Sequence, residues 1–226
     1  MLTGTIVNTI AIIAGALIGV IAKKAIPQRV GDLIMSAIPI VVMVLGVQFA
    51  MASSNILIVI VSLVIGGIIG EWIDIDKKLD DFGTKIQSRI KGKDANFSVA
   101  FVSTTLIYCV GSMAILGSIE SGINNNHTIL YTKALMDGIS AIFFASTLGT
   151  GVIFSGISVF IYQGILTVLA GYVSPYLSPA VVTEMSASGG ILLIALAFTI
   201  LGIKKIKVAN LLPAIFLPII LMFFIR

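Results

Sequence analysis

The feature that most constrains this chain is a series of long apolar stretches that contain no Asp, Glu, Lys or Arg. These stretches cover residues 2–22, 33–70, 95–119, 138–183, 185–203 and 208–225. A helix needs roughly 20 apolar residues to cross a hydrocarbon core of about 30 Å. Charged residues make up 11% of the 226 residues, whereas a typical soluble domain has about 25%. The sequence therefore predicts an all-α fold, a polytopic bundle of transmembrane helices in the lipid bilayer.

Two of the apolar stretches are too long for a single crossing. As one straight helix, residues 33–70 would be about 57 Å long, so we expect the chain to fold back at the polar residues 51–55. The stretch after Lys133 has its break at Gly149 and Gly151, although this pair of spans could instead be a re-entrant hairpin. The sequence predicts eight spans, at residues 3–22, 33–50, 56–73, 97–119, 133–148, 152–172, 185–203 and 208–225.

The basic residues are distributed very unevenly between the two sides of the predicted membrane. Twelve of the 14 Lys and Arg residues fall in the loops after the first, third and seventh spans, and only Lys133 and Arg226 fall elsewhere. Because cytoplasmic loops carry the excess of Lys and Arg, we expect these loops in the cytoplasm and both termini outside. Within residues 74–94 apolar side chains recur every three or four residues, which predicts an amphipathic cytoplasmic helix along the membrane surface.

Residues 1–73 and 151–226 resemble each other and predict an internal repeat within a single membrane domain. Pro, Val, an acidic residue and Ser recur at the same spacing in residues 27–36 and 179–188, so Asp32 corresponds to Glu184. The first and sixth spans are five crossings apart, which makes the two halves inverted. Residues 95–150, the fourth and fifth spans, lie between the halves. Many secondary transporters are built from inverted repeats of this kind.

Potential helix breakers occupy the second and seventh spans, one span in each half. The second contains Pro39, and the seventh contains Gly189 and Gly190. Interrupted segments in corresponding positions of two halves indicate a binding site, because unwound backbone exposes polar groups to a cavity. The alternative is structural: Pro39 would kink a packed helix, and the two glycines would allow close helix contact.

Polar residues at membrane depth are the candidates for a functional site, since each costs free energy unless it is paired. The predicted substrate- or ion-binding residues are Asp32, Glu184, Asp137, Asn8, Gln163, Ser186 and Ser188. Lys133 and Asp137 are four residues apart and can form an ion pair, whose alternative role is structural, near the outer interface. Hydrogen bonds between helices explain such amides equally well, and bonds to their own helix explain the serines.

The sequence also lacks the patterns of several other classes. It contains no phosphate-binding loop of the kind that hydrolyses ATP, and its single histidine, His127, has no second metal ligand nearby in sequence. We therefore expect a protein that is not an enzyme and that holds no metal or cofactor. No basic stripe with interleaved aromatic residues indicates a nucleic-acid partner.

Several segments resemble a known bacterial family. They are Gly4–Asn8, residues 27–32, Gly111–Gly117 and the stretch from Asp137-Gly138 to Gly149-Thr150-Gly151. Together they are similar to the membrane proteins with domain of unknown function 554, the YdfK/YqgA-like proteins, over essentially the whole chain. The resemblance implies a multi-pass protein of the bacterial inner (cell) membrane, described in that family as a candidate transporter, and it implies no substrate and no site residues.

These patterns favour a secondary transporter of a small polar solute or ion, coupled to a proton or cation, that works by alternating access of its inverted repeat. A passive channel and a non-transporting scaffold or accessory subunit are the alternatives. A channel predicts a continuous wetted pore, and a scaffold predicts apolar filling between the halves. The sequence leaves the oligomeric state open, a homo-oligomer included.

Overall fold

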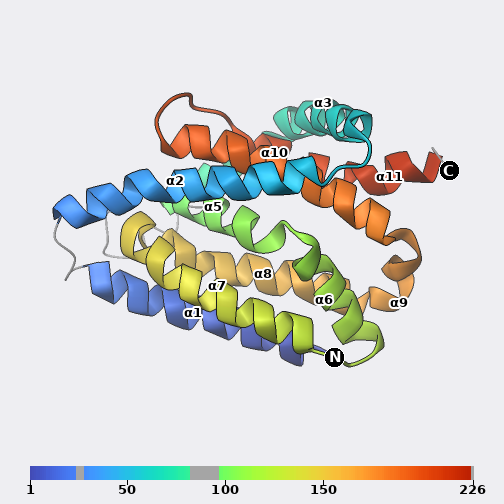
Figure 1. The fold of residues 1–226 in the computed structure, drawn as a ribbon, viewed down its shortest axis with the longest axis horizontal. Helices are drawn as coiled ribbons and strands as arrows, with labels where there is room; N and C mark the ends of the chain where they lie inside the picture. Colours follow the sequence, from blue (N-terminus) through green and yellow to red (C-terminus); the bar gives the residue numbers. More distant parts are fainter. Residues whose placement is uncertain (24–27, 82–96, 225–226) are drawn as a thin grey trace.

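The computed structural model of the protein describes residues 1–23, 28–81 and 97–224, and these ranges fold into helices joined by short turns (Figure 1). The helices in chain order are α1 (Thr3–Lys23), α2 (Gln28–Met51), α3 (Ile56–Ile73), α5 (Phe97–Cys109), α6 (Ser112–Ile123), α7 (Thr128–Leu148), α8 (Gly151–Val168), α9 (Ala170–Val173), η1 (Ser174–Tyr176), α10 (Pro179–Ile200), η2 (Val208–Ile215) and α11 (Leu217–Phe224). The predicted all-α class is confirmed.

Most of these helices have the length and apolarity of membrane spans. Five of them, α1, α3, α7, α8 and α10, qualify individually, and α5 with α6 qualifies as one bent pair. Two further apolar segments, Ser36–Met51 in α2 and Val208–Phe224, are shorter than these spans. A polytopic helical membrane bundle is thus confirmed, and each predicted span has a counterpart among these segments. α7 and α8 each have the length and apolarity of a full span, as the prediction of two separate spans requires.

The fourth predicted span differs from expectation because it is broken in its middle. The single helix predicted at residues 97–119 is two helices: α5 ends at Cys109, α6 starts at Ser112, and the two are bent by 61°. Gly111 has φ 117°, which a residue without a Cβ adopts at little cost. The kink therefore has an identifiable local cause.

Two other expectations about breaks were wrong. α2 runs through Pro39, and α10 runs through Gly189 and Gly190, without interruption. A Cβ on Gly189 would lie 2.5 Å from Val110 Cγ1, and one on Gly190 would lie 2.6 Å from the carbonyl oxygen of Gly46. The two glycines are there for close helix packing. The predicted break at Gly149 is confirmed, because this residue has φ 95° and separates α7 from α8.

The last crossing begins as a 3₁₀ helix, where a continuous α-helix was expected. η2 occupies Val208–Ile215, and the chain becomes α-helical only in α11. Pro213 and Pro218 lack the N–H groups that an α-helix would use here. The tighter η2 packs against α3, and a Cβ on Gly66 or Gly70 would overlap Ala214 or Asn210.

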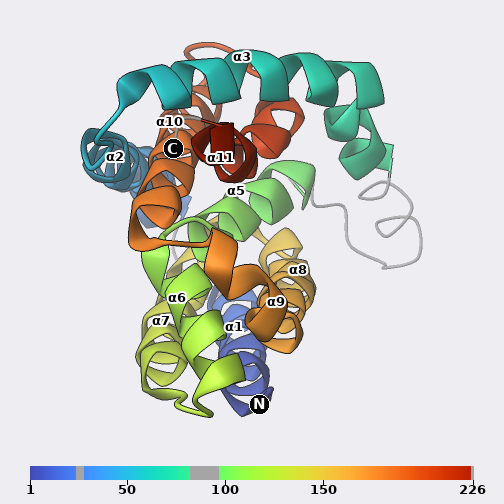
Figure 2. The same cartoon turned by 90° about the vertical axis from the view of Figure 1, so that its right-hand side faces the viewer.

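The helices pack in pairs whose directions can be read from their contacts. α1 runs parallel to α7, because Gly15 meets Gly138 and Gly19 meets Ile142. The same α1 runs antiparallel to α8, and α2 runs antiparallel to α10. Figure 2 shows α3 as an outer helix beside α10 and α11, where Trp72 is 90% exposed. Such exposed apolar surface fits contact with lipid.

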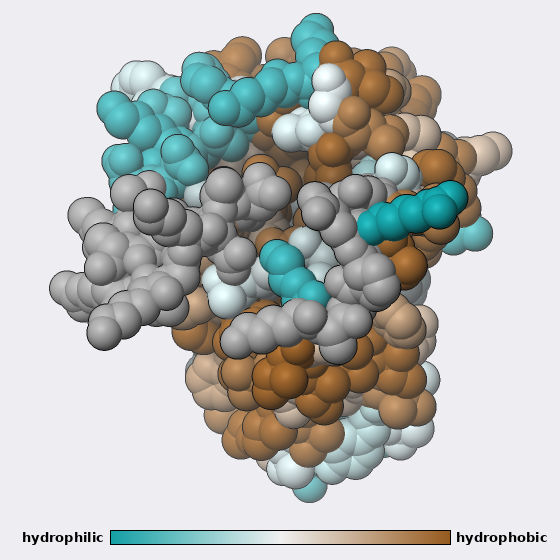
Figure 3. Space-filling model, turned by 90° about the vertical axis from the view of Figure 1, so that its left-hand side faces the viewer, coloured by the Kyte–Doolittle hydropathy of each residue, from teal (hydrophilic) through white to brown (hydrophobic). Residues whose placement is uncertain are grey.

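One end of the molecule holds the C-terminal end of α1, the N-terminal end of α2, the helical residues 75–81 and the loop 204–207 (Figure 1). Seen from this end, hydrophilic surface gathers in the upper part, above a largely apolar lower half (Figure 3). Both termini lie at the opposite end (Figure 1). Of the predicted surface helix at 74–94, residues 75–81 are helical, Asp74 is a turn residue, and residues 82–94 lie outside the described residues.

Candidate functional site

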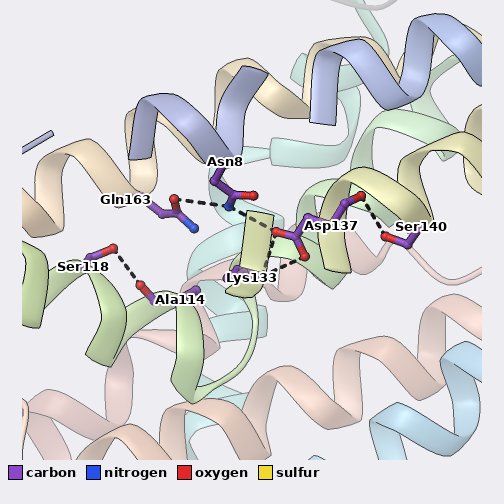
Figure 4. Close-up of polar contacts among 7 residues, drawn as sticks. All are labelled: Asn8, Ala114, Ser118, Lys133, Asp137, Ser140 and Gln163. Atoms are coloured by element: carbon purple, nitrogen blue, oxygen red, sulfur yellow. Dashed lines mark hydrogen bonds and ion pairs between the residues drawn. The ribbon is translucent and has the colours of Figure 1, made fainter. Parts of the chain in front are cut away.

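Four polar side chains from three helices meet in the interior of the bundle (Figure 4). Lys133 on α7 donates to Asp137 Oδ1 at 3.0 Å and lies 2.9 Å from Oδ2. Asn8 on α1 donates to Asp137 Oδ2 at 3.1 Å and to Gln163 Oε1 on α8 at 3.3 Å. We call Asn8, Lys133, Asp137 and Gln163 the interior cluster. Asn8, Asp137 and Gln163 are three of the seven predicted site residues. Lys133 was predicted only as the ion-pair partner of Asp137.

The interior cluster lies deeper than the sequence indicated. The predicted fifth span began at Lys133, which placed the ion pair near the outer interface. α7 in fact begins at Thr128 and has 21 residues, so Asp137 lies near its midpoint, about 14 Å from its start at 1.5 Å per residue. The predicted span started at the charged Lys133 and left out residues 128–132, which form the first turn of α7. The ion pair therefore lies farther along its helix than the predicted span implied.

Burial makes the interior cluster costly, and its pairing is what offsets the cost. Lys133 is 6% exposed, Asp137 is 7% exposed, and both amides are fully buried. Removing two charges from water costs several kcal/mol per ion unless geometry and hydrogen bonds compensate. Both Lys133 and Asn8 donate to the carboxylate, which supplies that compensation. A polar group kept at this depth is a functional candidate by default.

The hydrogen bonds also determine which amide atoms remain free. Asn8 uses Nδ2 to donate to both Asp137 and Gln163, so its Oδ1 takes no part in these bonds. Gln163 accepts through Oε1, so its Nε2 takes no part either. Asn8 Oδ1 and Gln163 Nε2 are buried and have no hydrogen-bond partner among the described residues. Buried polar atoms without partners are rare. The interior cluster thus retains one acceptor and one donor that a small molecule or ion could use.

Neighbouring polar groups extend the interior cluster along α1, α8 and α5. Thr5 and Thr167 approach within 3.4 Å between their hydroxyl oxygens, one turn away on the same helix pair. On α5, Tyr108 and Cys109 lie close enough to Asp137 to interact electrostatically with it. Both residues directly precede the bend at Gly111, so the broken span borders the site. The sequence signal that could have located this bend is Gly111 itself.

Glu184 belongs to a different cluster. It is 1% exposed and accepts hydrogen bonds from Ser53 Oγ at 2.6 Å, Ser54 N at 2.7 Å and Asn55 N at 3.1 Å. The backbone donors precede α3, where a helix N-terminus favours negative charge. We call Glu184 with residues 53–55 the α3 latch. It joins α10 to the α2–α3 turn and lies apart from the interior cluster.

The remaining predicted residues do not join the interior cluster. Ser186 Oγ donates to the carbonyl of Val182 in its own helix, as the structural alternative proposed. Ser188 Oγ is buried and lacks a partner among the described residues. The backbone of Asp32 lies in α2, but its side chain falls outside the described part of the structure.

A third cluster, which the sequence analysis missed, joins α3 to η2 at the basic end. Glu71 accepts from Lys207 Nζ at 2.8 Å and from Asn210 Nδ2 at 2.6 Å, and Asn210 Oδ1 accepts from Asp76 N at 2.7 Å. We call Glu71, Asp76, Lys207 and Asn210 the η2 latch. The hydrogen bond to Glu71 raises the pKa of Lys207. Partial burial, followed by the charge of Asp80, raises the pKa of Asp76.

Among the described residues, no group of three or more His, Cys, Asp and Glu side chains could hold a metal ion. The interior cluster instead combines an ammonium, a carboxylate and two amides, which can bind protons and small polar molecules.

Comparison with known proteins relates the whole chain to one family. A family model described as "Protein of unknown function (DUF554)" matches residues 3–223. The "Uncharacterized membrane protein YdfK" of Bacillus subtilis (strain 168) is 34% identical over 227 residues, which covers 99% of this chain and 96% of the relative. The "Uncharacterized protein YqgA" of Escherichia coli (strain K12) is 28% identical over 222 residues, with coverages of 96% and 94%. No solved structure matches. The chain therefore belongs to the DUF554 family of proteins.

Proposed function

We propose that this protein is a secondary transporter that carries a small polar solute or ion, coupled to a proton or cation, by alternating access. The observation that supports this most is the interior cluster. An ion pair and two incompletely bonded amides, held at mid-depth by α1, α7 and α8, are expensive to maintain in a membrane protein that only needs to pack. A broken span beside a buried polar site is a common arrangement in transporters.

The pairing of helices supports an inverted repeat. In an inverted repeat, a two-fold axis in the membrane plane relates the two halves. Two corresponding helices that pack against each other across this axis run antiparallel. The corresponding pairs are α1 with α8, α2 with α10, and α3 with η2. Contacts join the members of each pair in antiparallel order, such as Gly46 with Gly190. We take residues 1–73 and 151–226 as the two repeats on this basis.

The two latches provide contacts that alternating access would have to exchange. The α3 latch joins the second repeat to the first at the end of the molecule that holds both termini, and the η2 latch joins them at the basic end. Each depends on a carboxylate and a few hydrogen bonds, which a change of conformation can break. We propose that the latches open in turn.

Transport can be tested with purified protein in liposomes, using counterflow of a panel of small solutes under imposed pH and Na⁺ gradients. We expect saturable uptake of at least one solute by the wild type. The double variant Lys133→Met/Asp137→Leu removes both charges of the buried pair together and should abolish uptake. Lys204→Ala, at an exposed position, is the control and should transport normally.

Two other outcomes would replace the proposal. Single-channel conductance without saturation would indicate a passive channel. Absence of flux for every solute, together with stoichiometric co-purification of another protein, would indicate a scaffold or accessory subunit.

A further inference from the structure

The ammonium group of Lys133 occupies a position that a metal cation could otherwise take. It lies within 3.0 Å of both Asp137 oxygens, and the Lys133 residue is only 6% exposed. The interior cluster contains four side-chain oxygens, two on the carboxylate and one on each amide. Hard oxygen ligands of this kind bind small cations, and either amide can present its oxygen by turning about its last bond.

We infer that Lys133 is a tethered cation that excludes monovalent metal ions from the interior cluster, so that the ion exchanged at this site is a proton. The part that concerns exchange rests on the proposed transport function. A proton from one side adds to the Asp137 carboxylate, forming an O–H bond and weakening the pairing with Lys133. Release of that proton to the other side restores the ion pair, and charge and atoms balance over the cycle.

The groups around the ion pair are consistent with this inference. α1 and α8 contribute Asn8 and Gln163, which do not titrate. The titratable groups on α5 that interact with the pair are Tyr108 and Cys109. Both are ordinarily uncharged near neutral pH, so neither supplies a second negative charge that would hold a metal ion beside Lys133.

The inference can be tested by the salt dependence of thermal unfolding of detergent-purified protein, which does not require transport. At constant ionic strength, replacing a large organic cation with Na⁺, K⁺ or Li⁺ should leave the Tm of the wild type unchanged. Lys133→Ala opens the position, and its Tm should rise by about 5 °C when the preferred ion reaches about 100-fold its Kd. Methylammonium should also stabilise this variant, because it restores the missing ammonium.

Matched variants make the test specific. Lys133→Ala/Asp137→Asn should lose the cation effect, because the carboxylate that would attract the ion is gone. Lys204→Ala should behave like the wild type. Stabilisation of the wild type by Na⁺ relative to the organic cation would overturn the inference, and so would a folded Lys133→Ala protein that responds to none of the cations.

If Lys133→Ala does not fold in any salt, the inference is tested instead by measuring currents of the wild-type protein in solid-supported membranes. A transient current driven by a pH gradient and absent under a Na⁺ gradient supports proton exchange, whereas a current under the Na⁺ gradient alone contradicts it. The two proposals can fail separately. If cations stabilise Lys133→Ala but the wild type transports no solute, the transporter proposal is rejected and the inference that Lys133 occupies a cation position is retained.

Discussion

The buried ion pair between Lys133 and Asp137 leads to a prediction about stability at the scale of single residues. Asp137→Asn leaves the ammonium buried without its counter-charge, and breaking a buried pair in this way costs about 3–5 kcal/mol. We expect a correspondingly lower free energy of unfolding, measured by denaturation in detergent. Lys133→Met/Asp137→Leu should restore wild-type stability or exceed it by about 1–4 kcal/mol, because both charges are then absent.

A matched ion pair at the surface provides the control. Lys207 and Glu71 are 2.8 Å apart, a distance similar to that of the buried pair, but their side chains are 52% and 60% exposed. Lys207→Met should therefore change stability little, since solvent already screens the pair. Equal destabilisation by Lys207→Met and Asp137→Asn would show that burial does not determine the cost.

The sequence indicated which polar residues fall within apolar spans but not which of them meet. Asn8, Asp137 and Gln163 were selected because each interrupts an apolar span, and the four-residue spacing correctly paired Lys133 with Asp137. Their association depends on α1 packing parallel to α7 and antiparallel to α8, which a pattern within one helix does not report. Glu184 was selected by the same reasoning, yet its carboxylate binds the α2–α3 turn.

At the scale of helices, the contact between α1 and α7 predicts strong sensitivity to added volume. A Cβ on Gly15 would overlap the carbonyl group of Gly138, and backbone cannot move aside as a side chain can. We expect Gly15→Ala to separate the helices and to cost about 1–3 kcal/mol, the usual range for overpacking, or more. Gly164→Ala on α8 is the matched control, because nothing lies within 4 Å of its added Cβ.

The control substitution should be neutral or stabilise the protein by up to about 1 kcal/mol, since alanine favours helix over glycine. Both variants are compared by Tm in the same detergent. A Tm for Gly15→Ala equal to that for Gly164→Ala would mean that α1 and α7 do not approach as closely as described.

Helix positions were more predictable from sequence than helix breaks. Hydropathy depends on composition, so the spans and the turn at Gly149 could be recognised directly. Glycine by itself does not show where a helix breaks: Gly189 and Gly190 lie within α10, where Val110 and Gly46 pack closely against them. Gly111 bends the chain where Phe49 lies next to it. These contacts come from distant segments, which explains why the bend was placed in the wrong spans.

For the whole molecule, the uneven distribution of basic residues predicts the direction in which α10 crosses the membrane. α10 has 22 residues and is about 33 Å long, enough to cross the hydrocarbon core. Tyr176 precedes it and Lys204 follows it, and both are exposed. Because basic loops are retained in the cytoplasm, position 176 should face outward with both termini, and position 204 should face the cytoplasm.

Labelling of single cysteines in intact bacteria tests this orientation, with Cys109→Ser as the background. A membrane-impermeant maleimide should react with Tyr176→Cys in intact cells and with Lys204→Cys only after permeabilisation. The reverse pattern would invert the assigned orientation, and labelling of both positions from one side would mean that α10 does not cross.

The outcome matters for function, because the α3 latch and the η2 latch lie at opposite ends of α10. Only if α10 crosses the membrane can the two latches control access from opposite sides, as alternating access requires.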